Sequence, residues 1–442
     1  MTTQPHKRGL LDTIFIGVLL TIFAGIVFHA PLTIWLGTIF PGEALFIKAW
    51  KEVLLAGAVA IGGVVLWRRK QVSLLKEPIV LLVGAYVLIH LLLLPYSWDN
   101  ATSAVAGLLI DLRYVVYFVA VYVAIRLYPE LRRLFVIVFL AGASVVASFG
   151  VLQVFVLPPD FLTLLGYGDT TIAPYLTVDE NPDYIRISST LRGPNPLGAY
   201  AVIVLAVVAA LWVRRQITTK QQAWWLGVLT AASAVILWAS YSRSAAGAAA
   251  IAIGLIIVIA AGKKFMKWAL IGMASLAIIG GGLLYVARDT SFVSNVVLHE
   301  NETTGGSVSS NEAHFDSLAE GIELKVLQPL GAGIGSTGSA SLYSDDGLII
   351  ENQYLFIAHE VGWVGLVLFV YIFVWILRHL WRARSDWLSF AVFASGIGLA
   401  VIGILLPVWV DDTVAIIWWG LAAVALGGIH GRTIHKTSKR TA

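Results

Sequence analysis

Two arginines stand at the ends of long apolar segments, where a charged side chain is costly to bury. Arg192 precedes a Gly-Pro-Asn-Pro sequence, and Arg243 lies where two apolar runs meet. An ionisable residue at membrane depth indicates a functional site, because it needs a partner or a ligand. The planar guanidinium binds phosphate oxygens bidentately and stays charged near lipid. The two arginines therefore predict a site for an anionic ligand.

The elements that must position these arginines are membrane-spanning helices. Hydrophobic residues make up 58% of the 442 residues and charged residues 13%, which excludes a soluble globular protein. Apolar runs of about 20 residues can cross a bilayer, and they predict an all-α integral membrane protein with about twelve spans. The predicted spans are 10–28, 47–67, 79–95, 104–125, 134–156, 196–213, 223–241, 244–262, 267–287, 352–377, 386–406 and 413–429.

The distribution of lysine and arginine predicts how these helices are oriented. Most of the 30 such residues fall before the first span and in every second loop, which is the cytoplasmic side under the positive-inside rule. Both termini are then cytoplasmic. The chain divides into 1–287 with nine spans and an outward loop at 157–195, a large outward segment at 288–351, and 352–442 with three spans and a basic tail. The net charge of +4 follows from this bias and requires no nucleic-acid partner.

The outward segment 288–351 contains two features that suggest a membrane-surface site. Apolar residues that recur at helical spacing predict an interfacial amphipathic helix: Phe315, Leu318, Ala319, Ile322 and Val326. Alternating glycines then follow at Gly331, Gly333 and Gly335. Their missing side chains let the backbone approach a neighbour or a ligand closely, and a plain re-entry turn is the equally weighted alternative.

Four short motifs in these places resemble the bacterial O-antigen ligase and O-antigen polymerase group of membrane glycosyltransferases. They are Arg192–Asn195, Ser242–Arg243, Pro329–Gly333, and Glu351–Tyr354 followed by Glu360–Gly365. The resemblance implies a GT-C-like fold in the bacterial cytoplasmic membrane, with its active site facing outward. It also implies transfer of a glycan from undecaprenyl diphosphate to an acceptor hydroxyl on a lipid core, a glycan or a protein.

The resemblance also implies roles for individual residues. Arg192, Arg243 and Arg186 would bind the diphosphate among the membrane lipids, and Asn195 and Asn352 would orient polar groups. Cations so placed would neutralise the leaving diphosphate, so that no metal or other cofactor is needed. A single displacement would invert the anomeric centre. The shape of the outer loops slightly favours a ligase over a polymerase, which differs in its acceptor.

The residue that accepts the proton is where the chain departs from the family pattern. Family members commonly have a histidine where this chain has Glu351, and an arginine where it has His314. A carboxyl group near lipid has a raised pKa and can serve as a general base, and a structural role for Glu351 is equally weighted. His314 is the other candidate base, or a phosphate contact, and its charge would depend on pH.

Several other charged residues are predicted to be structural. Asp111 and Arg113 interrupt the fourth span two residues apart, so each should have its partner on another helix. Lys48 and Lys51 are predicted to extend to the outer interface. The adjacent pair Asp411 and Asp412 is predicted to lie in a solvated turn, and tryptophans at span ends are predicted to form an interface belt: Trp98, Trp409, Trp418 and Trp419.

A transporter of polyprenyl-linked or anionic glycans is the alternative from another class. Transporters commonly contain inverted repeats and broken helices near the middle of the bilayer. The sequence shows no repeat, and its unusual residues gather at the outer ends of helices. These features favour a transferase.

Overall fold

The computed structural model describes residues 8–178, 181–291, 293–294, 328–344 and 347–438. In this part of the chain, twelve helices are long and apolar enough to cross a membrane, which confirms an all-α multi-pass membrane protein. The spans are formed by α1 (Leu10–Gly25) with η1 (Ile26–Phe28) and α2 (His29–Ile39), α4 (Trp50–Arg68), α5 (Pro78–Leu93) with η4 (Leu94–Asn100), α6 (Ala101–Leu127), α7 (Leu131–Phe155), α8 (Pro194–Val213), α9 (Lys220–Ala239), α10 (Arg243–Val286), α13 (Gln353–Arg382), α14 (Trp387–Leu405) and α15 (Asp412–Ser438).

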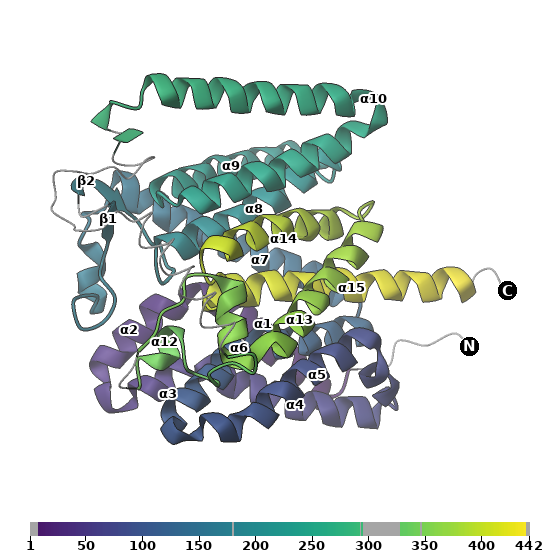
Figure 1. Cartoon of the computed structure of the whole chain (residues 1–442). Helices are drawn as coiled ribbons and strands as arrows, with labels where there is room; N and C mark the ends of the chain where they lie inside the picture. The colour runs from purple at the N-terminus through teal and green to yellow at the C-terminus, as the bar shows by residue number, and fades with distance from the viewer. Residues whose placement is uncertain (1–7, 179–180, 292, 295–327, 345–346, 439–442) are drawn as a thin grey trace.

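The helices pack side by side, and the start of α1 and the end of α15 lie at the same end of the bundle (Figure 1). We call this the termini end and the opposite one the far end. Ion pairs join helices near the termini end, among them Arg69 with Asp12 and Arg132 with Asp386. The α10 element is two spans, because the chain reverses at Gly262, where φ is +68°.

The first span is longer than the predicted 10–28, because it continues through η1 and α2 to Ile39. Pro31 does not end it, because α2 begins at His29 and the proline falls in its first turn. A helix tolerates proline there, since the first backbone N–H groups have no helical partner in any case.

The centre of the bundle is aromatic. Trp418 and Trp419 of α15 are fully buried, with ring centroids 5.5 Å apart, and Phe373 of α13 and Trp409 lie against them. The prediction that these tryptophans form an interface belt is wrong for Trp409, Trp418 and Trp419. Hydropathy alone does not distinguish an aromatic residue that faces lipid from one that fills the core. Trp98, which is 53% exposed, fits the prediction.

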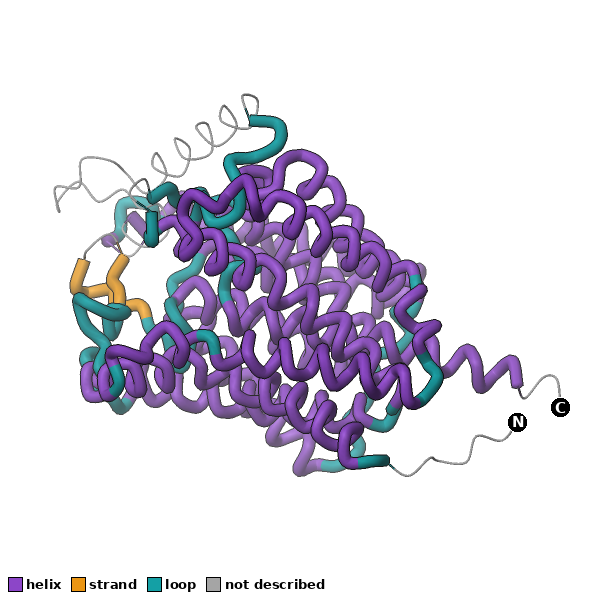
Figure 2. The backbone as a smooth tube through the Cα atoms, turned by 90° about the horizontal axis from the view of Figure 1, so that it is seen from below, coloured by secondary structure: helices purple, strands orange, loops and turns teal. Residues whose placement is uncertain are grey.

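Short elements cluster at the far end, where Figure 2 places the strands well away from the termini. They are η2 (Pro41–Glu43), α3 (Ala44–Lys48), η5 (Phe161–Leu165), β1 (Leu176–Val178), β2 (Asn181–Arg186) and α12 (Gly338–Ser341), while η3 (Val72–Lys76) joins α4 to α5. The antiparallel pair β1 and β2 was not predicted and pairs Leu176 with Arg186. The predicted amphipathic helix at 315–326 and the candidate base His314 lie outside the described residues.

Candidate functional site

A cavity of about 480 Å³ lies at the far end, among α2, α3, α4, α6 and the loop around residue 171. Its walls combine apolar side chains, among them Ile34, Leu45, Leu109 and Ile110, with charged ones. The charged residues come from four separate stretches of the chain: Lys48, Lys51, Glu52, Arg113, Arg192 and Asp412. Pockets of this kind, mostly apolar with a few converging polar groups, are where ligands usually bind.

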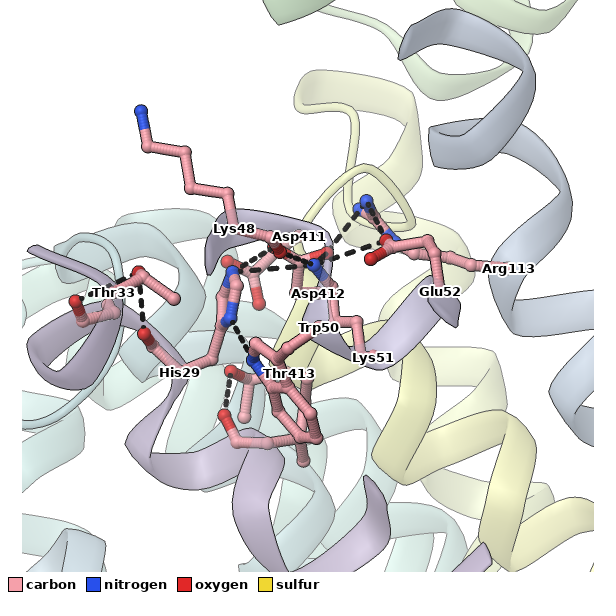
Figure 3. Close-up of polar contacts among 12 residues, drawn as sticks. His29, Thr33, Lys48, Trp50, Lys51, Glu52, Arg113, Asp411, Asp412 and Thr413 are labelled. Atoms are coloured by element: carbon pink, nitrogen blue, oxygen red, sulfur yellow. Dashed lines mark hydrogen bonds and ion pairs between the residues drawn. The ribbon is translucent and has the colours of Figure 1, made fainter. Parts of the chain in front are cut away.

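Asp412, the first residue of α15, lies at the centre of an ion-pair network beside the cavity (Figure 3). Its Oδ1 is 2.7 Å from Nη1 of Arg113 and 3.4 Å from Nζ of Lys51. Glu52 is 3.1 Å from the same Lys51 ammonium and 3.7 Å from Arg113. The network therefore ties α4, α6 and α15 together, and it confirms that Arg113 has its partners on other helices.

Two predictions about this network are wrong. Lys51 does not extend to an outer interface, because its residue is 5% exposed and its ammonium is bound by carboxylates. Asp412 is not in a solvated turn, because its side chain is 14% exposed and lies against Arg113, Lys51 and His29 from three other helices. In both cases an oppositely charged side chain from a distant part of the sequence makes burial favourable, since a buried charge must be paired.

His29, the first residue of α2, completes the network as a neutral side chain. The indole N–H of Trp50 donates to its Nδ1 at 3.0 Å, so the proton of the ring is on Nε2, which lies 3.0 Å from Asp412. Both ring nitrogens are thus engaged. The positive charges of Lys51 and Arg113 balance the negative charges of Glu52 and Asp412. The network therefore has no net charge that could attract a charged ligand.

Arg192 and Lys48 are the cations of the cavity that this network does not neutralise. Both are exposed and line the cavity. Neither side chain donates a hydrogen bond or forms an ion pair with another described residue, and the Lys48 side chain points away from the network in Figure 3. Two such cations beside apolar walls can bind an anion that carries a hydrocarbon chain.

The position of Arg192 is set by a buried segment that precedes α8. Ser189 has a φ of +50° and is held by two hydrogen bonds, from its N–H to Gln153 and from its hydroxyl to the carbonyl of Val146, each 2.7 Å long. Leu191 is fully buried, and Gly193 caps α8. Arg192 therefore extends from a backbone that α7 holds in place, as a preorganised ligand contact requires.

Asp411 lies between the network and Arg192 and is only partly buried. Burial raises the pKa of its carboxyl group, and the neighbouring Asp412 raises it further, against the opposite effects of the Val414 N–H, Arg192 and Arg113. In the described part of the chain, no group of three or more histidine, aspartate or glutamate side chains is arranged to hold a metal ion.

Arg186 and Arg243, the other arginines predicted to bind the diphosphate, do not line the cavity. Arg186 donates to Oδ1 of Asn195 at 2.7 Å and to the carbonyl oxygen of Ser240 at 3.0 Å. Arg243 begins α10 three residues after Ser240 and is exposed. The structure thus brings Arg186, Asn195 and the α9–α10 turn together, while Arg192 alone of the three arginines predicted to bind the diphosphate lines the cavity.

The two predicted site residues at the start of α13 are Asn352 and Glu351. Asn352 caps the helix, because its Oδ1 accepts from the N–H groups of Tyr354 and Leu355, and its amide donates to the carbonyl of Ile404 at 2.6 Å. Its carbonyl oxygen and one of its amide N–H groups are therefore engaged in holding the helix start. Glu351 is partly buried and is not among the residues that line the cavity.

The alternating glycines pack against a break in α13. Backbone angles at Gly362 interrupt this helix, and the Ala332 N–H donates to the freed carbonyl of His359 at 2.6 Å. Gly331 has a φ of +85°, and a Cβ there would lie 2.7 Å from the same oxygen. The close approach that these glycines predicted is therefore to a neighbouring helix.

Sequence reasoning did not identify His29, Lys51 and Asp412 as members of one network. The only local signal was that charged residues stand at the starts of three apolar spans, which does not show that they meet. No protein-family model matches the sequence, and a search of curated proteins finds no match.

Proposed function

We propose that this protein is a membrane glycosyltransferase that moves a glycan from undecaprenyl diphosphate to an acceptor hydroxyl, in the manner of O-antigen ligases. The acceptor would be a lipid core, a surface glycan or a protein, and a polymerase of the same family would use a growing glycan instead. The observation that carries the proposal is the cavity in which Arg192 and Lys48 lie exposed beside apolar walls, neither of them in an ion pair with a described residue.

Each part of such a donor has a matching part in the cavity. The planar guanidinium of Arg192 can bind two diphosphate oxygens at once, and Lys48 adds a second positive charge. The apolar walls can hold the first isoprene units of the lipid. In the reaction the acceptor oxygen bonds to C1 of the sugar, and the bond from C1 to the phosphate oxygen breaks. The leaving diphosphate takes the electron pair, and the two cations stabilise its charge. The hydroxyl proton passes to Glu351 or His314, and C1 is inverted.

The positions of the charged residues support an outward-facing site. The cavity lies at the far end, and the basic loops before α5, α7 and α14 lie at the termini end. Under the positive-inside rule the termini end is cytoplasmic. The cavity would then open at the outer leaflet, where a lipid-linked glycan is consumed.

The proposal is tested by transfer from purified undecaprenyl-diphosphate glycan to candidate acceptors, with and without EDTA. Wild type is compared with Arg192→Ala, Lys48→Ala and Glu351→Gln, and Lys70→Ala at the termini end is the matched control. We expect transfer that survives EDTA, falls in both cavity variants and is unchanged in the control. Equal activity in all variants would refute the assignment of the cavity.

A transporter of lipid-linked or anionic glycans is the second candidate, and one observation favours it. The break in α13 at Val361 and Gly362 is a discontinuous span of the kind that many transporters have. Proteoliposomes loaded with labelled donor separate the two functions. Movement of intact donor across the bilayer without bond cleavage would support the transporter.

A further inference from the structure

Three titratable side chains meet in the interior of the bundle, away from the cavity. His90 of α5 and Glu360 of α13 are fully buried, and Asp111 of α6 is 6% exposed. Nε2 of His90 lies 3.5 Å from Oδ2 of Asp111. Glu360 lies beside Asp111 and faces the backbone N–H groups of Gly335 and Thr337. Neither Glu360 oxygen makes a hydrogen bond of normal geometry to a described residue.

Counting protons shows that this cluster cannot be neutral with both carboxyl groups ionised. Nδ1 of His90 lies 2.9 Å from the carbonyl oxygen of Tyr86, which can only accept, so Nδ1 carries a proton. If His90 is an imidazolium, it balances one carboxylate, and the other carboxyl must be protonated. If His90 is neutral, both carboxyls must be protonated. Every neutral arrangement therefore places a proton on Asp111, Glu360 or both.

Among the residues that the structure describes, no lysine or arginine side chain forms an ion pair with the cluster. The groups that face it are the phenols of Tyr86 and Tyr114. Arg113, two residues along α6, is held by Asp412, Glu52 and the carbonyl of Val410 on another side of the helix. An unpaired carboxylate enclosed in this way costs several kcal/mol, so a bound proton is the arrangement that burial favours.

The backbone segment that Glu360 faces also forms one wall of the cavity. Ser339 and Tyr343, which follow it, line the cavity. The Ser103 hydroxyl of α6 lies 2.6 Å from the carbonyl oxygen of Gly335, which holds the start of this segment on α6. The segment that forms this wall therefore contacts α6 through Ser103 and α13 through Glu360.

We propose that the buried cluster of His90, Asp111 and Glu360 keeps a proton on one of its carboxyl groups, and that this proton pins the 335–343 wall of the cavity. Loss of the proton leaves two carboxylates facing each other in an enclosed site, where like charges repel strongly. The wall then separates from α6, and the cavity opens. The inference concerns the cavity itself and does not depend on the reaction that takes place there.

Stability against pH is the first test, on the full-length protein in detergent. A folded state that holds more protons than the unfolded state loses stability as the pH rises. We expect the unfolding midpoint of wild type to fall as the pH rises above the ordinary range of a carboxyl group. In Glu360→Gln and Asp111→Asn, which keep the shape but not the titration, this dependence should be nearly absent. Glu130→Gln, an exposed carboxyl at the termini end, is the matched control and should follow wild type.

Opening of the wall is tested by thiol labelling, for which the chain is suited because it has no cysteine. The labelling rate of Ser339→Cys measures the accessibility of the wall that is proposed to move. The labelling rate of Thr38→Cys measures the accessibility of the wall on α2. Each labelling rate is divided by the labelling rate of the same variant unfolded at the same pH. This ratio removes the effect of thiol ionisation on the rate. We expect the Ser339→Cys ratio to rise by up to about tenfold per pH unit, and to stay flat after Glu360→Gln. The Thr38→Cys ratio should stay flat in both.

Two results would overturn the proposal. One is a pH dependence of stability or labelling in both carboxyl variants that equals that of wild type. The other is stabilisation by sodium chloride, but not by potassium or N-methylglucamine chloride, that Glu360→Gln removes. That second result would identify a bound metal cation in place of the proton.

Discussion

Nη1 of Arg113 and Oδ1 of Asp412 lie 2.7 Å apart, which joins the middle of α6 to the first residue of α15 at the edge of the cavity. Both side chains are largely buried, at 5% and 14% exposed. Lys51 and Glu52 extend the pair to α4. This contact is therefore both a link in the bundle and a wall of the candidate site.

Replacing Arg113 should destabilise the protein strongly. Arg113→Ala leaves Asp412 and Glu52 with Lys51 as their shared cation, and breaking a buried pair typically costs about 3–5 kcal/mol. Unfolding in mixed micelles measures this loss. Arg8→Ala, which breaks an exposed pair with Glu130, should cost only about 0–1 kcal/mol. Equal losses in the two variants would mean that the network is not structural.

Gly335→Ala should disrupt the contact between α6 and the wall of the cavity. Gly335 has a φ of +79°, and a Cβ there would lie 2.1 Å from the carbonyl oxygen of Ser103. The backbone strain alone costs about 1–3 kcal/mol, and the clash adds to it. Gly63→Ala in α4, where a Cβ meets nothing within 4 Å, should be neutral or stabilising by up to about 1 kcal/mol. The two unfolding midpoints are compared directly, and a stable Gly335→Ala protein would contradict this packing.

Arg192 and Lys48 should affect ligand binding without affecting stability, because both are exposed and donate no hydrogen bond to a described residue. A hydrogen bond to a charged group contributes about 1.5–3 kcal/mol. Arg192→Ala should therefore weaken binding of undecaprenyl diphosphate by about 10–100-fold. Arg192→Lys should restore part of it, since the charge remains but the fork is lost. Calorimetry with lipid in micelles measures both, and a lower unfolding midpoint in Arg192→Ala would argue for a structural role.

Asp386 should make the termini end sensitive to acid. Burial alone would raise the pKa of its carboxyl group, but Arg132 and Ser389 outweigh burial and hold the pKa below its usual value. The stabilisation is then present above the ordinary pKa of about 3.9 and is lost as the pH falls below it. Asp386→Asn should lower the unfolding midpoint at pH 7 and flatten its fall between about pH 5 and pH 3. Asp183→Asn, on the exposed hairpin, should keep the wild-type profile; if it flattens equally, Asp386 is not the titrating group.

The sequence was informative wherever a property is local. A span is recognisable because about 20 consecutive apolar residues are needed to cross the bilayer, and all twelve predicted spans have helical counterparts. A glycine with positive φ is also a local property, so the glycines at 331, 333 and 335 marked a close approach before its partner was known. The same reasoning identified Arg113 as a residue that needs a partner.

What the sequence by itself determined is therefore the membrane-spanning, all-α character of the chain and the residues whose charge or missing side chain demanded an explanation. Only the tertiary structure decided which charges pair. Asp412 meets Arg113 and Lys51, and Asp111 meets His90 and Glu360, through helices far apart along the chain. The same hydropathy also allowed Trp418 to face lipid or the core. Helix packing determines these contacts, because an apolar helix satisfies its own backbone and leaves the choice of neighbours to side-chain complementarity.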